Sequence, residues 1–343
     1  MDRYIMETNL NNKTILFGLS ASEGLADAVA KKLGTELSPI KIQRFADGEI
    51  LVAPQVSVRG RDVAIIQSVC NPVNENLMEL LIAIDAVRRS SARSINVIIP
   101  YIGYARQDRK TGPREPITFK LVANMLQASG ATRILTFDIH SDQTQGFFDI
   151  PFDSMRLSIF LLNEFIKDKD LFDFVVVSPD YGGIKRARTI STLVNKPLAI
   201  IDKRRPSPNQ VEIKNILGDV KDKDCLIFDD MIDTGGTMLA SAKLLKEHGA
   251  RTVSILVTHG LFNGNAAERF NEAYDQGYIN NVLVTDTIER PIGIKCLKVV
   301  SVDHIIADVI KLFTEETGAM SEIIKRNTQE LSCKIQIELD KRN

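Results

Sequence analysis

Long apolar runs, clustered cysteines and a large net charge are all missing from this chain of 343 residues. No apolar run is long enough to cross a bilayer, and the N-terminus lacks the apolar segment of a signal peptide. The formal net charge of -1 gives no reason to expect binding to nucleic acid or to a membrane surface. The four cysteines (Cys70, Cys225, Cys296 and Cys333) are widely spaced without a Cys-x-x-Cys pair, which predicts reduced thiols in a cytoplasmic protein.

The remaining composition is that of a globular protein with more than one domain. Hydrophobic residues make up 44% of the chain and charged residues 25%, as in ordinary globular proteins. A chain of 343 residues is too long for one core of typical size, so we expect two domains.

Short apolar segments alternate with amphipathic ones along the chain. The expected strands are residues 14–19, 62–67, 95–100, 134–138, 174–178, 198–201, 226–229, 253–257 and 282–285. Most are rich in Val, Ile and Leu without strict alternation, which is typical of parallel strands buried on both faces. The expected helices are residues 74–89, 117–129, 155–167, 183–194, 237–248 and 303–313. The pattern predicts an α/β fold with parallel sheets, and it runs twice, with a join near residues 150–155.

The segment 225–237 carries the strongest functional signal. An apolar run ends in the acid pair Asp229 and Asp230, and a turn of Asp, Thr and two glycines then leads into an apolar-periodic segment. Gly235 and Gly236 allow backbone N–H groups to converge, and the N-terminus of the next helix adds the positive end of its dipole. Such a turn suits a phosphate, and the acids suit sugar hydroxyls. A lone Gly-Gly pair would favour an ordinary turn, but its acidic and threonine neighbours favour a ribose 5-phosphate site.

An acid and a histidine follow the expected strand 134–138. Asp138 and His140 stand where ligands bind in parallel α/β sheets, and on an extended backbone they lie on the same side. Mg²⁺ would take the carboxylate directly and share nucleotide phosphates, whereas His140 suits a phosphate or a metal-bound water. The alternative is that the acids here only cap turns and helices, and Asp153 in particular fits the N-cap of the next helix.

Two cationic segments also follow expected strands. Residues 101–116 contain several arginines, whose guanidinium groups grip phosphates and stack on bases. Residues 201–209 place three consecutive cations before two prolines, which predicts a mobile basic loop that closes over polyphosphates. For both segments the alternative is a solvated charge run or surface linker.

A fifth motif is the Phe-Ala-Asp-Gly-Glu segment at residues 45–49. It contains a tight Asp-Gly turn, and taken alone it predicts only a hairpin.

Taken in their order along the chain, the five motifs resemble those of ribose-phosphate diphosphokinase, also called phosphoribosyl diphosphate synthetase. The resemblance covers about residues 13–314 and includes the segments 145–151, 177–188 and 258–260. It implies an enzyme of nucleotide biosynthesis that transfers the diphosphoryl group of ATP to the anomeric hydroxyl of ribose 5-phosphate. The products would be 5-phosphoribosyl 1-diphosphate and AMP.

The family's fold implies two similar phosphoribosyltransferase-like domains, each with a mainly parallel sheet flanked by helices. We expect the ATP side at residues 13–153 and the ribose 5-phosphate side at 154–316. Residues 1–12 would form an N-terminal extension, and residues 317–343 a C-terminal tail that is either partly helical or frayed.

Carried over position by position, the resemblance assigns roles to three sets of residues. The ribose 5-phosphate set is Asp229, Asp230, Asp233, Thr234, Gly235, Gly236 and Thr237. The ATP set is Arg106, Gln107, Arg109 and His140, joined by Phe45, Asp47 and Glu49 from a neighbouring subunit. The Mg²⁺ set is Asp138, His140 and Asp180, and Lys203 and Arg205 are the catalytic cations. The family also implies a homo-oligomer, with dimers assembling to a hexamer, and no nucleic-acid or membrane partner.

Departures from the family pattern limit these expectations. Gly235 stands where many members carry Ala or Cys, although Gly is also found there. Residues 318–324 differ from the serine-containing segment that helps to form the regulatory phosphate and ADP site, so we expect altered phosphate activation and ADP inhibition.

Two rival interpretations differ in function class. A salvage phosphoribosyltransferase shares the segment 229–237 but usually has one domain and lacks the motifs at 45–49 and 106–109. A non-catalytic regulatory subunit would have lost active-site cations, whereas Lys203 and Arg205 are present. The sequence therefore favours the active synthetase.

Overall fold

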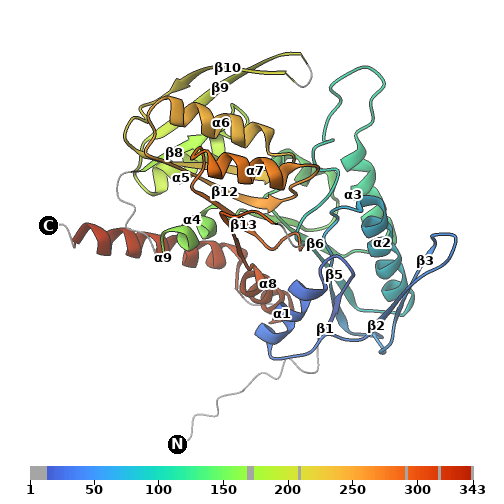
Figure 1. Cartoon of the computed structure of the whole chain (residues 1–343). Helices are drawn as coiled ribbons and strands as arrows, with labels where there is room; N and C mark the ends of the chain where they lie inside the picture. The colour runs from blue at the N-terminus through green and yellow to red at the C-terminus, as the bar shows by residue number, and fades with distance from the viewer. Residues whose placement is uncertain (1–13, 168–173, 208–209, 290–292, 316–317, 341–343) are drawn as a thin grey trace, which may run out of the picture. The chain divides into compact units, whose positions relative to one another are not determined.

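The structure, a computed structural model, describes residues 14–167, 174–207, 210–289, 293–315 and 318–340 (Figure 1). It divides into two compact units, the first consisting of Met1–Met155 and Val302–Met320 and the second of Arg156–Ser301 and Ser321–Asn343. Within the described residues, no helix is both long and apolar enough to span a membrane.

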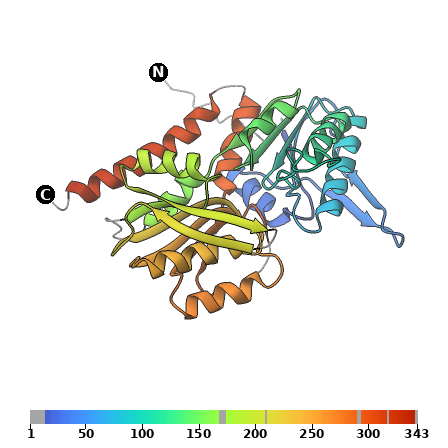
Figure 2. The ribbon, with the colours of Figure 1, turned by 90° about the horizontal axis from the view of Figure 1, so that it is seen from above.

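The first unit is built on a parallel sheet with the strand order β1-β4-β5-β6-β7. A separate antiparallel hairpin of β2 and β3 projects away from this sheet (Figures 1 and 2). The elements are β1 (Thr14–Gly18), α1 (Glu23–Leu33), β2 (Ile40–Arg44), β3 (Ile50–Pro54), β4 (Asp62–Ile66), α2 (Val73–Arg89), β5 (Ser94–Ile99), α3 (Thr118–Ser129), β6 (Arg133–Phe137), η2 (Asp142–Phe147), β7 (Phe152–Met155) and α8 (Asp303–Glu315).

The core of the first unit follows from the sequence pattern. Strand β4 is buried from Val63 to Ile66, as a run without alternation requires in a sheet covered on both faces. Helix α2 buries its apolar stripe, including Leu80, Ile84 and Val87, against the sheet. Helix α3 ends at Gly130, whose φ of 118° is open to glycine, so the predicted stop is confirmed.

The second unit has a larger sheet, in the order β10-β9-β8-β11-β12-β13-β14, in which only β10 is antiparallel to its neighbour. Its apolar core lies between this sheet and helices α6 and α7, whereas α4 packs on the other face (Figure 2). The elements are α4 (Ser158–Ile166), β8 (Phe174–Ser178), α5 (Ile184–Leu193), β9 (Leu198–Ser207), β10 (Gln210–Leu217), β11 (Asp224–Ile232), α6 (Gly236–Glu247), β12 (Thr252–Gly260), α7 (Ala266–Asp275), β13 (Asn281–Thr285), β14 (Leu297–Val300) and α9 (Met320–Asp340).

Helix α8 belongs to the first unit, although the expected boundaries placed it in the second domain, 154–316. It packs against α1, and its Thr314 hydroxyl lies 2.9 Å from that of Thr14 on β1. The guanidinium of Arg133 lies 4.5 Å from the ring centre of Phe313. These contacts return the chain to the first unit after the second sheet is complete, which a linear division of the sequence does not anticipate.

The expected helix 155–167 begins later than its pattern suggested. Residues Phe152–Met155 form β7, which pairs with β6, and α4 begins only at Ser158. Asp153 therefore lies in a strand and is not an N-cap, and burial raises the pKa of its carboxyl. The stacking of Phe152 on Phe148, with ring centres 4.2 Å apart, holds this edge strand in place.

The tail is helical over the described residues 320–340. Helix α9 buries Ile323 and Leu331, and the Asn163 amide of α4 donates to Asn327 O at 2.8 Å. Of the two alternatives for the tail, the structure therefore confirms the helix. The extension 1–12 lies outside the described residues.

Candidate active site

An acid pair and an arginine meet at the carboxyl end of β11. Arg186, from α5, places its Nη1 2.8 Å from Asp229 Oδ1 and 3.6 Å from Asp230 Oδ1. The three side chains are only 6–16% exposed. Charges this close and this little hydrated interact strongly, so the protonation of the acids depends on their immediate neighbours.

The pKa of Asp229 is raised well above its ordinary value of 3.8. Burial is the main cause and the charge of Asp230 adds to it, whereas Arg186 opposes the shift. Any group that donates hydrogen bonds to a buried carboxylate of this kind stabilises its charged form. The acid pair is therefore suited to the hydroxyls of a sugar.

The turn after β11 leads directly into α6. Gly235 has a φ of 75°, and the helix begins at the next residue. The turn is braced from α7 and the loop before it. Asn263 donates to Asp233 O at 3.0 Å and to Asp233 Oδ1 at 2.8 Å, and Arg269 donates to Thr234 O at 3.0 Å. A braced turn at a helix N-terminus is a suitable anion site.

Gly235 is needed for space as well as for its backbone conformation. A Cβ at this position would lie 2.4 Å from Cε2 of the buried Phe270 ring. At Gly236 the nearest atom would be Arg269 Nη2 at 3.8 Å, an ordinary contact. The two glycines of the motif therefore differ: the first is required by packing and φ, and the second leaves the approach to the helix open. Thr237, in the first turn of α6, is half-buried.

Asp180 follows β8, the strand next to β11. Its Oδ1 accepts the Gly183 N–H at 3.0 Å, and its backbone carbonyl accepts the Ser178 hydroxyl at 2.7 Å. These bonds fix the carboxylate at the same sheet edge as the acid pair. Its charge also contributes to the raised pKa of Asp229.

The basic segment at residues 201–209 is not a loop in its described part, so the prediction of a mobile loop is wrong for residues 201–207. Lys203 and Arg205 lie on β9, and the backbone of Lys203 pairs with Ile213 of β10. Extension of β9 beyond the apolar residues depends on pairing with β10, which the local sequence does not reveal.

In the first unit, Asp138 and His140 follow β6. Asp138 is 3% exposed and has a φ of 35°, whereas His140 is exposed. The backbone is therefore not extended here, and the expectation of two side chains on the same side of a strand is wrong. Asp138 is fixed at the sheet edge, and His140 is accessible beside it.

The cationic segment leaves the carboxyl end of β5, the strand next to β6. Arg106, Gln107 and Arg109 are exposed, and Gln107 accepts the Thr118 hydroxyl at 2.6 Å. Glu115 accepts hydrogen bonds from the N–H groups of Thr111 and the residue after it, each at 2.8 Å. These bonds and one from the Thr111 hydroxyl lower the pKa of Glu115, with the hydroxyl the largest cause. The segment is thus folded on itself with its cations outward.

The motif at residues 45–49 is the tip of the β2–β3 hairpin, as the turn residues predicted. Phe45 N–H donates to Glu49 O at 2.9 Å, and Glu49 N–H donates to Asp47 Oδ1 at 3.1 Å. The Phe45 ring is 44% exposed although it is large and apolar. An aromatic and two acids are therefore presented together, away from the sheet of this unit (Figure 1).

The predicted residues fall into groups within each unit. In the second unit the acid pair, Asp180 and the turn 233–237 share one sheet edge. In the first unit the Arg106 segment and the Asp138 segment share another. Sequence reasoning gave no role to Asn263, Arg269 and Phe270, because they are brought to the turn from 30 or more residues away. Arg186 was singled out only as part of a motif.

No group of three or more His, Cys, Asp or Glu in the described part of the chain is arranged to hold a metal ion by itself. Mg²⁺ needs only one or two carboxylates when nucleotide phosphates and water complete its shell. Asp138 and Asp180, each at the carboxyl end of a parallel strand, fit that kind of site.

Comparison with known proteins shows two matching domains. Residues 14–130 match the N-terminal domain of ribose phosphate pyrophosphokinase, and residues 150–298 match the phosphoribosyl transferase domain. The chain is 55% identical over 325 residues to the ribose-phosphate pyrophosphokinase of Ureaplasma parvum serovar 3, covering 94% of this chain and 98% of that protein. It is 54% identical over 283 residues to that of Mycoplasma genitalium, covering 82% of this chain and 84% of the relative. The crystal structure of phosphoribosylpyrophosphate synthetase from Mycobacterium smegmatis matches with a TM-score of 0.80 and 40% identity, over 89% of this chain and all of that one.

Proposed function

Because the chain belongs to the ribose-phosphate pyrophosphokinase family, we propose that the carboxyl edge of its second sheet binds ribose 5-phosphate and that of its first sheet binds ATP. The protein is a diphosphotransferase: it transfers the diphosphoryl group of ATP to the anomeric hydroxyl of ribose 5-phosphate, forming 5-phosphoribosyl 1-diphosphate and AMP. The assignment of individual residues to this reaction is the proposal.

The observation that carries the proposal is the acid pair beside a braced glycine turn. Asp229 and Asp230 would accept hydrogen bonds from the ribose hydroxyls, and the N–H groups of residues 233–237 would hold the 5-phosphate at the start of α6. Arg186 offsets part of the negative charge of the buried acids when no sugar is present. These groups fix the sugar with its anomeric hydroxyl free to react.

On the ATP side, the exposed Arg106 and Arg109 would grip phosphates, with Gln107 and His140 adding hydrogen bonds. Phe45, Asp47 and Glu49 would contact the adenine of a neighbouring subunit, since their hairpin projects away from its own sheet. This placement supports a homo-oligomer, for which we propose dimers assembling to a hexamer. The described cysteines are free thiols, which supports a cytoplasmic location.

Mg²⁺ is the divalent ion we propose, because hard carboxylate and phosphate oxygens are its preferred ligands. Asp138, beside His140, and Asp180 would hold it. When bound, the ion supplies positive charge to the phosphates of ATP.

Transfer of a phosphoryl-type group depends on alignment and charge neutralisation. Lys203 and Arg205 would neutralise the negative charge that moves toward AMP as the bond to the β-phosphorus breaks. The strand placement of both residues supports a fixed position for the backbone that carries these cations.

Two assays test this proposal. Purified protein should form AMP from ATP only when ribose 5-phosphate is present, and failure would favour a non-catalytic subunit. Lys203→Ala should lower kcat by about 100-fold with little change in either KM. Arg204→Ala removes a cation from the adjacent position and is the matched control. A large KM effect with unchanged kcat in Lys203→Ala would contradict its catalytic role.

We also propose weakened phosphate activation and ADP inhibition, because residues 318–324, in which Ser321 is the one serine, differ from the family segment that helps to form the regulatory site. In the structure these residues lead into α9 and bury Ile323. A steep phosphate requirement with strong ADP inhibition would contradict this proposal.

A further inference from the structure

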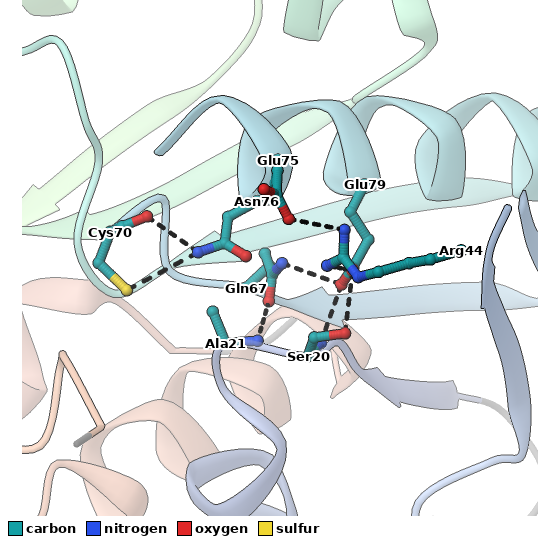
Figure 3. Close-up of polar contacts among 8 residues, drawn as sticks. All are labelled: Ser20, Ala21, Arg44, Gln67, Cys70, Glu75, Asn76 and Glu79. Carbon is teal, nitrogen blue, oxygen red and sulfur yellow. Dashed lines mark hydrogen bonds and ion pairs between the residues drawn. The ribbon is translucent and has the colours of Figure 1, made fainter. Parts of the chain in front are cut away.

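A fully buried acid connects α2 to the strand ends of the first unit (Figure 3). Glu79 has a side-chain exposure of 0% and accepts four hydrogen bonds. Ser20 donates its N–H and its hydroxyl, each at 2.9 Å, Gln67 donates its amide at 3.1 Å, and Arg44 donates Nη2 at 3.3 Å. A buried carboxylate is tolerated only when donors of this kind surround it, so each donor is held in place in return.

The donors come from parts of the chain that are far apart in the sequence. Ser20 follows β1, and Gln67 follows β4 and accepts the Ala21 N–H at 3.0 Å. Arg44 is the last residue of β2, and the turn begins with Phe45. The network therefore joins the carboxyl ends of two sheet strands to the base of the hairpin tip.

Arg44 forms a fork between two acids in different surroundings. Its Nη1 lies 2.8 Å from Glu75 Oε2, and the Glu75 side chain is 55% exposed. Its Nη2 reaches Glu79, which is inaccessible to water. The planar guanidinium satisfies both acids at once, whereas the single ammonium of a lysine cannot match this geometry.

The body of the hairpin has its own attachment, because Val52 is buried and Ile40, Ile42 and Ile50 pack against the core. These residues alternate along β2 and β3, so they attach one face of the hairpin through apolar contacts, whereas Arg44 adds a polar one. Arg44, one residue before Phe45, and its cross-strand partner Ile50, one residue after Glu49, are the contacts next to the tip. Its fork fixes the direction in which the β2 strand enters the turn.

We propose that Arg44 is a positioning residue for nucleotide-base recognition, acting through the buried Glu79 to orient the tip 45–49. The inference rests on the proposed role of that tip in contacting the adenine. Arg44 does not touch the nucleotide in this account. It determines how precisely the Phe45 ring and the tip carboxylates meet the base, so its loss changes base affinity and base selectivity more than the chemical step.

The test compares Arg44→Gln, Arg44→Lys and Glu79→Gln with the control Glu75→Gln in the full-length protein. Arg44→Gln should raise the KM for ATP about tenfold and reduce the preference for ATP over GTP, since small misplacements of binding groups weaken recognition. The KM for ribose 5-phosphate and kcat should stay within about twofold. Arg44→Lys should recover part of the ATP affinity, and Glu79→Gln should resemble Arg44→Gln. Glu75→Gln should change little, because exposed ion pairs contribute little.

A purely structural role would lower the melting temperature and kcat and would raise the KM values for both substrates together. That result would overturn the inference. If Arg44→Gln cannot be purified in folded form, Arg44→Lys and Glu79→Gln carry the same test. Phe45→Ala separates this inference from the proposed function. If Phe45→Ala raises the KM for ATP but the Arg44 and Glu79 variants do not, only the positioning role fails. If Phe45→Ala has no effect, the assignment of the tip fails and the inference falls with it.

Discussion

The two units are alike at the amino ends of their strands and differ at the carboxyl ends. Asp62, at the start of β4, accepts hydrogen bonds from Arg93 Nε at 2.8 Å and from the hydroxyl of the next residue at 2.7 Å. Asp224, at the start of β11, accepts from Arg251 Nε at 3.0 Å and from the hydroxyl of the next residue at 2.6 Å. We call each set an amino-end clasp: Asp62 with Arg93 and Ser94 in the first unit, and Asp224 with Arg251 and Thr252 in the second. Each clasp joins the first residues of two neighbouring parallel strands. The clasps support the similarity of the two halves more directly than any sequence repeat.

Beside the carboxyl ends of the strands the acids have different surroundings, with Glu79 on α2 next to the ends of β1 and β4 and Asp229 on β11 itself. Glu79 of the first unit is surrounded by donors from its own chain. Asp229 of the second unit has Arg186 and a second acid beside it, and its pKa is raised. An acid whose hydrogen bonds are internal holds the fold together, whereas an acid pair next to a glycine turn suits a ligand. The comparison teaches that the two sheets are alike at the amino ends of their strands and diverge at the carboxyl ends, where we propose that the substrates bind.

The hairpins of the two units, β2–β3 and β9–β10, also differ in how they relate to the main sheet. The β2–β3 hairpin stands apart as a two-stranded sheet, whereas β9 and β10 extend the main sheet of the second unit. Each hairpin comes directly before the strand whose first residue is the clasp aspartate, β4 in the first unit and β11 in the second. A shared connection has thus been used to present a projecting tip in one unit and a cationic strand in the other.

The largest expected effect comes from the acids of the second unit. Asp229→Asn and Asp230→Asn should each lower kcat/KM for ribose 5-phosphate by about 100-fold, since charge-assisted hydrogen bonds are worth ~3 kcal/mol. Steady-state kinetics at saturating ATP measures the change. If both variants keep normal kcat/KM, the acids at the carboxyl end of the second sheet do not bind the sugar, and the contrast drawn with the first sheet is wrong.

Asp229→Asn should also change stability in a pH-dependent way. Because the folded-state pKa of Asp229 is raised above the ordinary value of 3.8, its ionisation destabilises the fold increasingly as pH rises from that value to the folded pKa. The asparagine variant removes this cost. Its melting temperature relative to that of the unaltered protein should therefore be higher at pH 7 than at pH 4, and a difference that is independent of pH would contradict the assigned burial effect.

The next effect separates the two glycines of the turn. Gly235→Ala should destabilise the second unit by about 2–3 kcal/mol, because the new Cβ meets Phe270 and the backbone has a positive φ. Gly236→Ala is the matched control and should cost less than about 1 kcal/mol. Thermal unfolding measures both. Adding Phe270→Leu to Gly235→Ala should recover part of the loss, and equal costs at the two glycines would refute the packing argument.

Most of the sheet could be predicted from the sequence, because strands such as β8 and β13 are short apolar runs buried on both faces. Prediction failed where tertiary pairing decides the structure. The strands β2 and β3 on either side of the predicted hairpin turn, the cationic half of β9 and the edge strand β7 become strands only through their partners. Helices α1 and α7 were also missed, and α8 was assigned to the wrong unit.

The glycine turn 233–237 was predictable because acids, glycines and threonines are adjacent in the sequence. The network around Glu79 was not, because Ser20, Arg44 and Gln67 are separated from it by up to 59 residues. The backbone at Asp138, with its φ of 35°, also follows from tertiary packing that no local pattern predicts.

The smallest expected effect concerns the amino-end clasps. Asp62→Asn and Asp224→Asn should each lower stability by about 1 kcal/mol or less without changing kcat, since the arginines are more than half exposed. The hydrogen bond from Arg93 is the largest cause that lowers the pKa of Asp62, against the opposing effect of burial. That contribution is present above the unfolded pKa and is lost as pH falls through the folded pKa. The melting temperatures of Asp62→Asn and the unaltered protein should therefore converge in acid, and a gap that widens there would argue against the clasp.

The most direct test of the account is a calorimetric titration of ribose 5-phosphate in the presence of Mg²⁺ and a non-hydrolysable ATP analogue. The proteins to compare are the unaltered chain, Asp230→Asn and Glu79→Gln. We predict that Asp230→Asn weakens the Kd for ribose 5-phosphate by at least about tenfold, while Glu79→Gln keeps that Kd and lowers the melting temperature. An unchanged Kd in Asp230→Asn, or an equal loss of affinity in both variants, would contradict the assignment of the sugar to the carboxyl edge of the second sheet.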